Sequence, residues 1–419
     1  MKLTKKSKRV LKLTDHFLGE PKWYSYNNIF SARKLKYIVK ITDEKNEIKK
    51  PKVLSVTQKG IIVKDIDSGK GQQSLDYSKY PLVKKGNFVM NHMDLLTGYV
   101  DISNFEGVTS PDYRVFKLVD ENIDPQYLLK ICQICYKLKV FYAFGQGVSL
   151  FGRWRFVEDN FLNFKIPYPD KKKQKKILEE IDKIEKKFLP LIHSVEKRIE
   201  LIREYFNSQI DLIFKKAISN ISKGKMTKIK YFCKLKSGNS LNSEAKEKYA
   251  NYSGDCHPYI STENIDYETS TINYKGNFKI PKNEKNFKIA EKNSILLCIE
   301  GGSYGKKISI TEHDVCFVNK LCNIKTEINS KYLFYFLKSS HFKNEFFSRR
   351  IGLISGVRQD EIAEIKVPLI NQQEQEKISK LIDIQFKNNN ETIVLSKKYL
   401  SKIQEYYYKI IFDKLVGNN

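Results

Sequence analysis

The chain contains an internal repeat at half-chain spacing, and this repeat limits the folds that it can adopt. Residues 159–182 read DNFLNFKIPYPDKKKQKKILEEID, and residues 360–383, which lie 201 positions further on, read DEIAEIKVPLINQQEQEKISKLID. Each copy runs from an extended segment through a proline into a long polar helix. Two such copies indicate one module used twice, with two similar functions held a fixed distance apart.

A long amphipathic helix is predicted after each copy of the repeat. Over residues 171–219 and 372–415 the apolar residues recur at steps of four and three, as in Ile177, Ile181 and Ile184. This is the spacing of a coiled-coil seam. Neither helix can bury its seam alone, so we expect the two to pack against each other. Pro190 predicts a kink in the first helix, and three consecutive asparagines at 388–390 interrupt the seam of the second.

The segments before the two helices predict two mixed domains and therefore an α+β fold. Short runs rich in β-forming residues, such as 52–56, 60–63 and 88–91, alternate with turn residues. Single helices are expected at 125–141 and around 331–347. We divide the chain into two α/β domains, at 1–165 and 220–366, and two helical spacer regions, at 166–219 and 367–419.

The charge of the chain favours a polyanionic partner. Lysine and arginine number 75 against 48 aspartate and glutamate, which gives +27, so nucleic acid is the expected ligand. A lysine-rich genome is the alternative explanation. The seven cysteines, an odd number, fit the reduced thiols of a cytoplasmic protein. No apolar run approaches the roughly 18 residues that a membrane-spanning helix needs, so we expect no membrane association.

Motifs for catalysis and cofactor binding are incomplete. In residues 300–307 (EGGSYGKK) three residues rather than four separate the outer glycines, and Lys307 stands where a nucleotide-binding loop needs Ser or Thr. A DNA-facing loop and a plain hairpin turn are the interpretations that remain. Cys132 and Cys135 lack the nearby second pair that a zinc site needs, which favours core packing. We therefore expect this chain to have no catalytic residue, no metal site and no cofactor of its own.

The two helix entries resemble the specificity subunit of a type I restriction–modification system. Both copies follow the pattern K-[IV]-P-x-x-x-x-x-x-Q-x-K-I, starting at Lys165 and Lys366, and the resemblance covers essentially the whole chain. Residues 86–91 (GNFVMN) resemble one recurrent recognition-domain pattern, and residues 259–266 (YISTENID) and 300–306 resemble another.

The resemblance implies that each domain is a target-recognition domain, which reads half of a split DNA sequence. It implies that the two helices form an antiparallel coiled coil that sets the spacing and docks two methyltransferase (modification) subunits. Restriction and translocase subunits would join through the complex, and S-adenosylmethionine, Mg and ATP are expected on the partner subunits. The chain itself would be non-catalytic. A type IIB-like specificity subunit is the runner-up interpretation, and a nuclease with a cryptic active site is the alternative from another class.

The candidate DNA-binding residues are polar and basic side chains on turns. Arginine can contact guanine through two hydrogen bonds, and glutamine or asparagine can contact adenine in the same way. Arginines precede both long helices, as a doubled reader of double-stranded DNA would require. Ordinary surface charge is the alternative explanation for each. The candidates are Asn91, His92, Arg114, Arg153, Arg155, Lys236, Ser303, Tyr304, Lys306, Lys307, Arg349, Arg350, Arg358 and Gln359.

Overall fold

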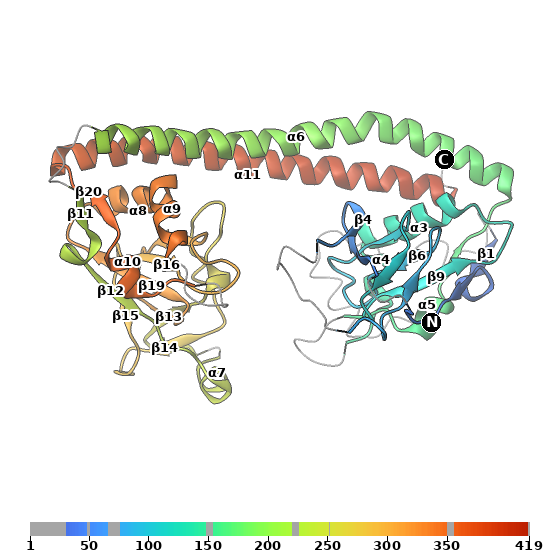
Figure 1. Ribbon diagram of the computed structural model, residues 1–419, viewed down its shortest axis with the longest axis horizontal. Helices are drawn as coiled ribbons and strands as arrows, with labels where there is room; N and C mark the ends of the chain where they lie inside the picture. Colours follow the sequence, from blue (N-terminus) through green and yellow to red (C-terminus); the bar gives the residue numbers. More distant parts are fainter. Residues whose placement is uncertain are drawn as a thin grey trace. The chain divides into compact units, whose positions relative to one another are not determined.

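The computed structural model describes residues 31–47, 51–65, 76–147, 154–219, 226–250, 252–349 and 356–417. The chain forms two compact units (Figure 1). Unit 1 comprises Met1–Ser194 and Tyr399–Asn419, and unit 2 comprises Val195–Lys398. Each unit therefore contains one mixed domain and one part of each long helix.

The domain of unit 1 is built from small sheets. Among its described residues, one four-stranded sheet has the order β2(Val39–Ile41), β9(Arg114–Leu118), β6(Phe88–Met90) and β7(Val100–Ile102). A second has the order β4(Gly60–Val63), β3(Val53–Thr57), β8(Gly107–Thr109) and β5(Leu82–Val83). Within these two sheets, β3 and β8 are parallel and the other paired strands are antiparallel. β1(Ala32–Lys34) pairs with β10(Lys165–Pro167), directly before the first long helix.

The domain of unit 2 repeats this topology strand for strand. Its described residues form the sheet β12(Cys233–Ser237), β19(Leu321–Thr326), β16(Ile295–Cys298) and β17(Ile308–Ile310). They also form the sheet β14(Lys279–Pro281), β13(Cys256–Ile260), β18(Val315–Phe317) and β15(Ile289–Ala290), in which β13 and β18 are parallel. β11(Met226–Lys228) pairs with β20(Lys366–Pro368) as β1 does with β10. The internal repeat therefore extends over the whole domain, far beyond the segment that is visible in the sequence.

Each domain also contains a helical segment that is broken where the sequence predicts one continuous helix. α3(Pro125–Lys137) begins at Asp124, whose carboxylate accepts hydrogen bonds from two backbone N–H groups of the first turn. Lys139 then has a left-handed φ of +58° and precedes the separate α4(Val140–Ala143). In unit 2, α8(Ser330–Lys338) and α9(Ser340–Ser348) are separated by Ser339, which is extended and caps α9. The predictions of single helices at 125–141 and 331–347 are wrong, because local backbone geometry and capping interrupt a continuous apolar pattern.

The two long helices pack against each other within each unit. α6(Lys171–Ser219) and α11(Gln372–Val416) have the extents that the sequence predicts, and α6 continues on both sides of Pro190. In unit 1 the ring centroids of Phe188 and Tyr407 are 5.7 Å apart. In unit 2 those of Phe206 and Phe386 are 5.2 Å apart. The beginning of each helix thus meets the end of the other, which confirms the antiparallel pairing.

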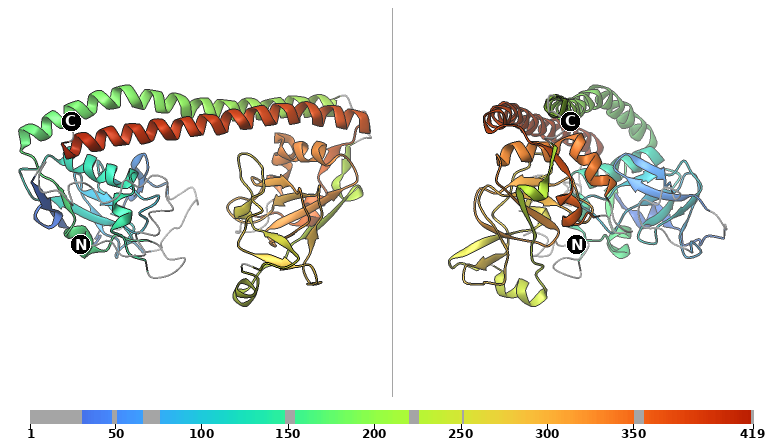
Figure 2. Two further views of the ribbon diagram at one scale, coloured as in Figure 1. Left: turned by 180° about the vertical axis from the view of Figure 1, so that it is seen from behind. Right: turned by 60° about the vertical axis from the view of Figure 1, so that its left-hand side comes forward.

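The hydrophobic core of unit 2 lies between its sheet and the two long helices. Residues 332–337 of α8 are all buried, because β16 and β19 cover one side of the helix while α6 and α11 cover another. A helix that is apolar on all sides is typical of such a fully buried position. Figures 1 and 2 show α8 and α9 between the strands of unit 2 and the long helices.

A buried glutamine ties each domain to the start of its long helix. Gln174 and Gln375 occupy equivalent positions in the repeat, and they are 0% and 4% exposed. Oε1 of Gln174 accepts a hydrogen bond from Asp124 N (2.8 Å), and its Nε2 donates to two backbone carbonyls (2.9 and 2.8 Å). Gln375 accepts from Asn329 N (3.1 Å) and donates to one carbonyl (2.8 Å). The glutamine in both copies therefore satisfies the N-cap backbone of α3 or α8.

The architecture confirms the predicted α+β class, with two domains and two long helices related by an internal pseudo-repeat. None of the helices in the described ranges combines the length and apolarity that crossing a bilayer requires.

Candidate nucleic-acid interface

The described candidates of unit 1 lie near the end of β6. Asn91 and His92 directly follow this strand, and the carbonyl of His92 accepts a hydrogen bond from Phe156 N (2.8 Å). Arg114, on β9, is 6% exposed and donates from Nη2 to Phe156 O (3.0 Å). Arg155 immediately precedes this phenylalanine. Folding thus brings His92 and Arg114, from two separate segments, into contact with Phe156 beside Arg155.

Burial controls the charge of His92 and Arg114. Desolvation, together with the nearby Arg114, lowers the pKa of His92 to about 4, so the imidazole is neutral near pH 7. Desolvation also lowers the pKa of Arg114 to about 10, which leaves the guanidinium charged above the Phe161 ring at 4.7 Å. Among the described residues, neither the buried Nδ1 of His92 nor the buried Nη1 of Arg114 has a hydrogen-bond partner. His92 can therefore act as a neutral hydrogen-bonding group rather than as a cation for phosphates.

Arg155 is exposed, and its backbone is held in place. Its N and O pair with those of Gln146 (3.0 and 2.8 Å). The preceding Trp154 donates its indole N–H to Tyr142 O (2.7 Å) and stacks on the Tyr142 ring at 5.4 Å. Gly145 makes room for this indole, since a Cβ there would lie 2.3 Å from Nε1 of Trp154. The local packing thus fixes the point from which the Arg155 side chain extends.

The glycine-rich segment of unit 2 connects β16 to β17 in a hairpin. Gly301 and Gly305 have φ of +87° and +67°, the left-handed region that favours glycine. A Cβ on Gly305 would lie 2.8 Å from the Phe347 ring, and Tyr304 packs on that ring at a centroid distance of 5.3 Å. The backbone of residues 300–307 therefore forms a hairpin turn, which is one of the two interpretations of this segment. Lys306 is exposed on that turn.

Several other candidates of unit 2 bond within their own unit. Lys307 Nζ donates to Thr262 O (2.6 Å), and Ser303 O accepts from the backbone N–H of Lys307 (3.2 Å). Gln359 begins α10(Gln359–Ala363) and donates its amide to the Ser237 hydroxyl. Lys236 is the exposed residue beside that serine on β12.

Arg349 and Arg358, the described candidate arginines of unit 2, form ion pairs with carboxylates of the same unit. Arg349 contacts Glu345 (3.2 Å) and Glu361 (3.3 Å), so it joins the end of α9 to α10. Arg358 is exposed and makes two hydrogen bonds to Asp360 (3.1 and 2.7 Å). DNA phosphates would compete with these carboxylates. Arg153 and Arg350 lie outside the described residues, and the DNA contacts of all fourteen candidates stay predictions.

The structure also reveals a group that the sequence analysis missed. Arg203 of α6, Lys338 of α8 and Lys343 of α9 line one cavity. They are far apart in the sequence, and two lie in apolar helices, where a lysine gives no recognisable signal. Within the described ranges, no group of three or more His, Cys, Asp or Glu side chains is placed to hold a metal ion.

Comparison with solved structures finds similar chains of nearly equal length. One comes from a study of complex assembly and conformational transition of the type I restriction–modification system. It is 12% identical, has a TM-score of 0.56 and covers 94% of this chain and 99% of its own. At this identity the likeness shows the fold alone. The S subunit from M. genitalium is 16% identical (TM-score 0.36; 95% of this chain and 98% of that one). HsdS from Thermoanaerobacter tengcongensis is 12% identical (TM-score 0.34; 94% and 98%). No curated protein matches the sequence.

The family model for the type I restriction modification DNA specificity domain matches the chain twice, at residues 28–201 and 221–412. The two matches span most of the chain, and they follow the two domains and their long helices. The chain therefore belongs to the type I restriction–modification DNA specificity family, whose members are non-catalytic DNA-recognition subunits, as the resemblance predicts.

Proposed function

We propose that this chain reads a bipartite DNA target, with one half recognised by each unit. The observation that supports this most directly is the strand-for-strand repetition of one domain topology, each copy leading into its own long helix. Lysine and arginine contacts to phosphates would supply affinity, and side chains on the turns would read base edges. The net charge of +27 fits this proposal, because contacts to DNA phosphates need cationic side chains whatever the base sequence.

We further propose that the long helices dock two methyltransferase subunits. Exposed apolar groups on a helix that is already paired mark a surface for another protein. Tyr205 and Tyr406 occupy equivalent positions in the repeat and are 59% and 60% exposed. Two equivalent contact points suit two copies of one partner. The remaining exposed apolar residues of α6 and α11 are Leu189, Leu191, Leu201, Leu212, Leu381, Ile384, Val394, Leu395 and Tyr399.

In this proposal the chemistry belongs to the partners. The methyltransferase subunits would carry S-adenosylmethionine, and the restriction and translocase subunits would use Mg and ATP in the cytoplasm. A type IIB-like system would use the same architecture with other partners, and it remains the second candidate.

The first experiment separates recognition from chemistry. The purified chain is incubated with DNA and labelled S-adenosylmethionine, alone and then with two equivalents of the methyltransferase subunit. We expect labelled DNA only in the second case. Methylation by the chain alone would refute the non-catalytic role, and metal-dependent cleavage by the chain alone would favour the nuclease alternative.

The second experiment tests the division of the target. Residues 1–165 are replaced by the equivalent part of a related subunit, and methylated sites are mapped in cells that carry the hybrid. One half of the recognised sequence is expected to change while the other stays the same. A change in both halves would mean that the two domains read DNA jointly.

A further inference from the structure

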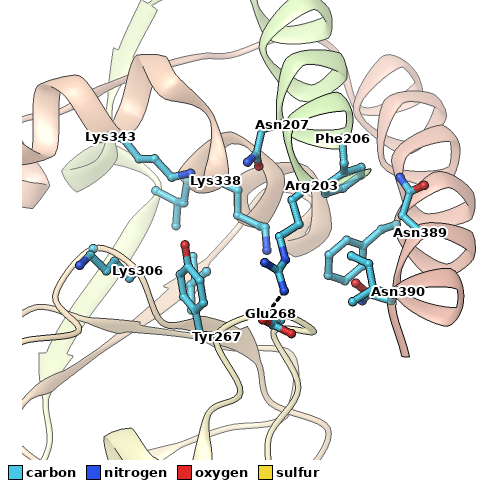
Figure 3. A pocket seen from close by; sticks show the side chains of 15 residues that line it. Arg203, Phe206, Asn207, Tyr267, Glu268, Lys306, Lys338, Lys343, Asn389 and Asn390 are labelled. Carbon is cyan, nitrogen blue, oxygen red and sulfur yellow. Dashed lines mark hydrogen bonds and ion pairs between the residues drawn. The ribbon is translucent and has the colours of Figure 1, made fainter. Parts of the chain in front are cut away.

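Unit 2 contains a cavity of about 90 Å³ between its domain and its part of the long helices. This volume accepts several water molecules or one small anion. Figure 3 shows Arg203 and Lys338 entering the space from above and Tyr267 and Glu268 from below. The lining residues are Arg203, Phe206, Asn207, Tyr267, Glu268, Gly305, Lys306, Ile308, Leu337, Lys338, Lys343, Phe386, Asn389, Asn390 and Ile393.

Positive charge dominates the lining. Four cationic side chains and a single carboxylate, that of Glu268, line the cavity. This carboxylate already forms ion pairs with Arg203 and with Lys397, which lies on α11 outside the lining. The charges of Lys306, Lys338 and Lys343 are thus left without a matching carboxylate in the lining. Asp211 lies near Lys343 and favours its charged form in part.

Lys338 is the most constrained of these cations. Its Nζ donates to the Ser270 hydroxyl (2.6 Å) and lies 4.8 Å from the ring centroid of Phe386 and 5.3 Å from that of Phe334. Among the described residues, no carboxylate lies within ion-pair distance of it. Burial, and then the nearby Lys343, lower its pKa to about 7. A buried ammonium group without a counter-charge is costly, and an anion beside it would remove that cost.

The repeat indicates that two amides of this lining are specific to unit 2. At the spacing of 201 residues, Asn389 corresponds to Phe188 and Asn207 corresponds to Tyr408. In unit 1, Phe188 packs on the ring of Tyr407 at 5.7 Å, and the rings of Tyr407 and Tyr408 are 5.0 Å apart. Two positions that carry aromatic rings in unit 1 therefore carry amides in unit 2. Amide N–H groups, lysine and arginine all donate hydrogen bonds to an oxyanion.

We propose that the cavity of unit 2 binds a phosphate-type anion, held by Lys338 and by the Nε–H of Arg203, which has no hydrogen-bond partner among the described residues, with the amides of Asn389 and Asn390 at its side. The anion is either a free phosphate compound or a phosphate of the DNA backbone. Lys306 is compatible with either source of the anion, because it lines the cavity and is also exposed on the β16–β17 turn. The proposal does not depend on the bipartite reading of DNA.

The test uses the full chain, with inorganic phosphate and ATP as separate probes in isothermal titration calorimetry. Lys338→Met removes the charge and keeps an apolar stem against the two phenylalanines. Asn389→Phe installs the side chain of the corresponding position in unit 1 and fills the space without removing a charge. The matched controls are Lys246→Met, on α7(Ser243–Tyr249), and Asn388→Phe, the exposed neighbour on α11. Thermal melting verifies that each variant is folded.

We expect saturable binding of at least one probe, with a rise in Kd of tenfold or more in Lys338→Met and in Asn389→Phe and no change in the controls. DNA affinity is measured in parallel by fluorescence anisotropy. If phosphate and ATP do not bind but the same two variants weaken DNA binding, the anion is a backbone phosphate. The proposal is overturned if neither variant changes the binding of phosphate, ATP or DNA, or if the controls change it equally.

Discussion

Replacing Gln174 with methionine tests whether one buried amide holds the first domain to its helix. Methionine has a similar length and cannot make the three hydrogen bonds of the glutamine amide. Each such bond contributes ~1 kcal/mol net, and the partners left behind are buried. We therefore expect a loss of ~3 kcal/mol in the free energy of unfolding of unit 1. Since 1 kcal/mol lowers the Tm of a domain of this size by ~2–4 °C, unit 1 should melt ~6–12 °C earlier.

The second copy of the repeat provides the internal comparison. Gln375 makes two such bonds, so Gln375→Met should cost ~2 kcal/mol and should affect unit 2. Gln373→Met, at an exposed position of α11, serves as the neutral control. Hydrogen-exchange mass spectrometry assigns each effect, because α3 peptides should exchange faster in the first variant and α8 peptides in the second. A loss below ~0.5 kcal/mol in both variants would refute this role of the glutamines.

Three further outcomes are expected. Arg155→Ala and Lys306→Ala should each reduce the slope of log K against log salt concentration for DNA binding by ~1, as measured by fluorescence anisotropy; an unchanged slope would place that residue away from phosphates. Ile384→Asp, at a residue 62% exposed on α11, should prevent co-elution with methyltransferase subunits in gel filtration while DNA binding persists, and normal co-elution would contradict the docking surface. The pKa of His92 falls from 6.5 to about 4 on folding, so the unfolded chain takes up the proton first and stability is lost as the pH falls from 6.5 to 4. His92→Gln should therefore lose less stability than the unmodified chain between pH 7 and pH 5, as measured by urea unfolding. Equal losses in the two proteins would contradict this.

The long helices were predictable because their signal is local. The periodicity of Ile177, Ile181 and Ile184 predicts a helix whatever lies beside it, and α6 extends over the range expected. The breaks at Lys139 and Ser339 were not predictable from apolar periodicity, because each depends on the conformation of a single residue. Strand pairing was also missed, since β3 and β8 are about fifty residues apart along the chain. Register between distant strands is set by packing that only the folded chain contains.

The candidate site was predictable only in its general character. Charge and turn composition indicate basic groups for DNA, but the sequence gives no sign that Arg114 is buried against Phe156 or that Arg349 is held by Glu345 and Glu361. The cavity around Lys338 was missed for the same reason. Its lining combines residues of both long helices with the domain, and they come together only when the helices pair.

The division of the chain into units has a consequence for its synthesis. Unit 2 is one continuous stretch, whereas unit 1 needs residues from both parts of the chain. Tyr407, Ile411 and Leu415 of α11 are buried in unit 1, so that unit cannot complete its core until these residues have left the ribosome. The half that is translated first therefore finishes folding last, and its α6 seam stays open to chaperones or to a second nascent chain in the meantime. A ribosome that stops after Lys398 would release a chain whose second unit is whole and whose first unit lacks its helical partner.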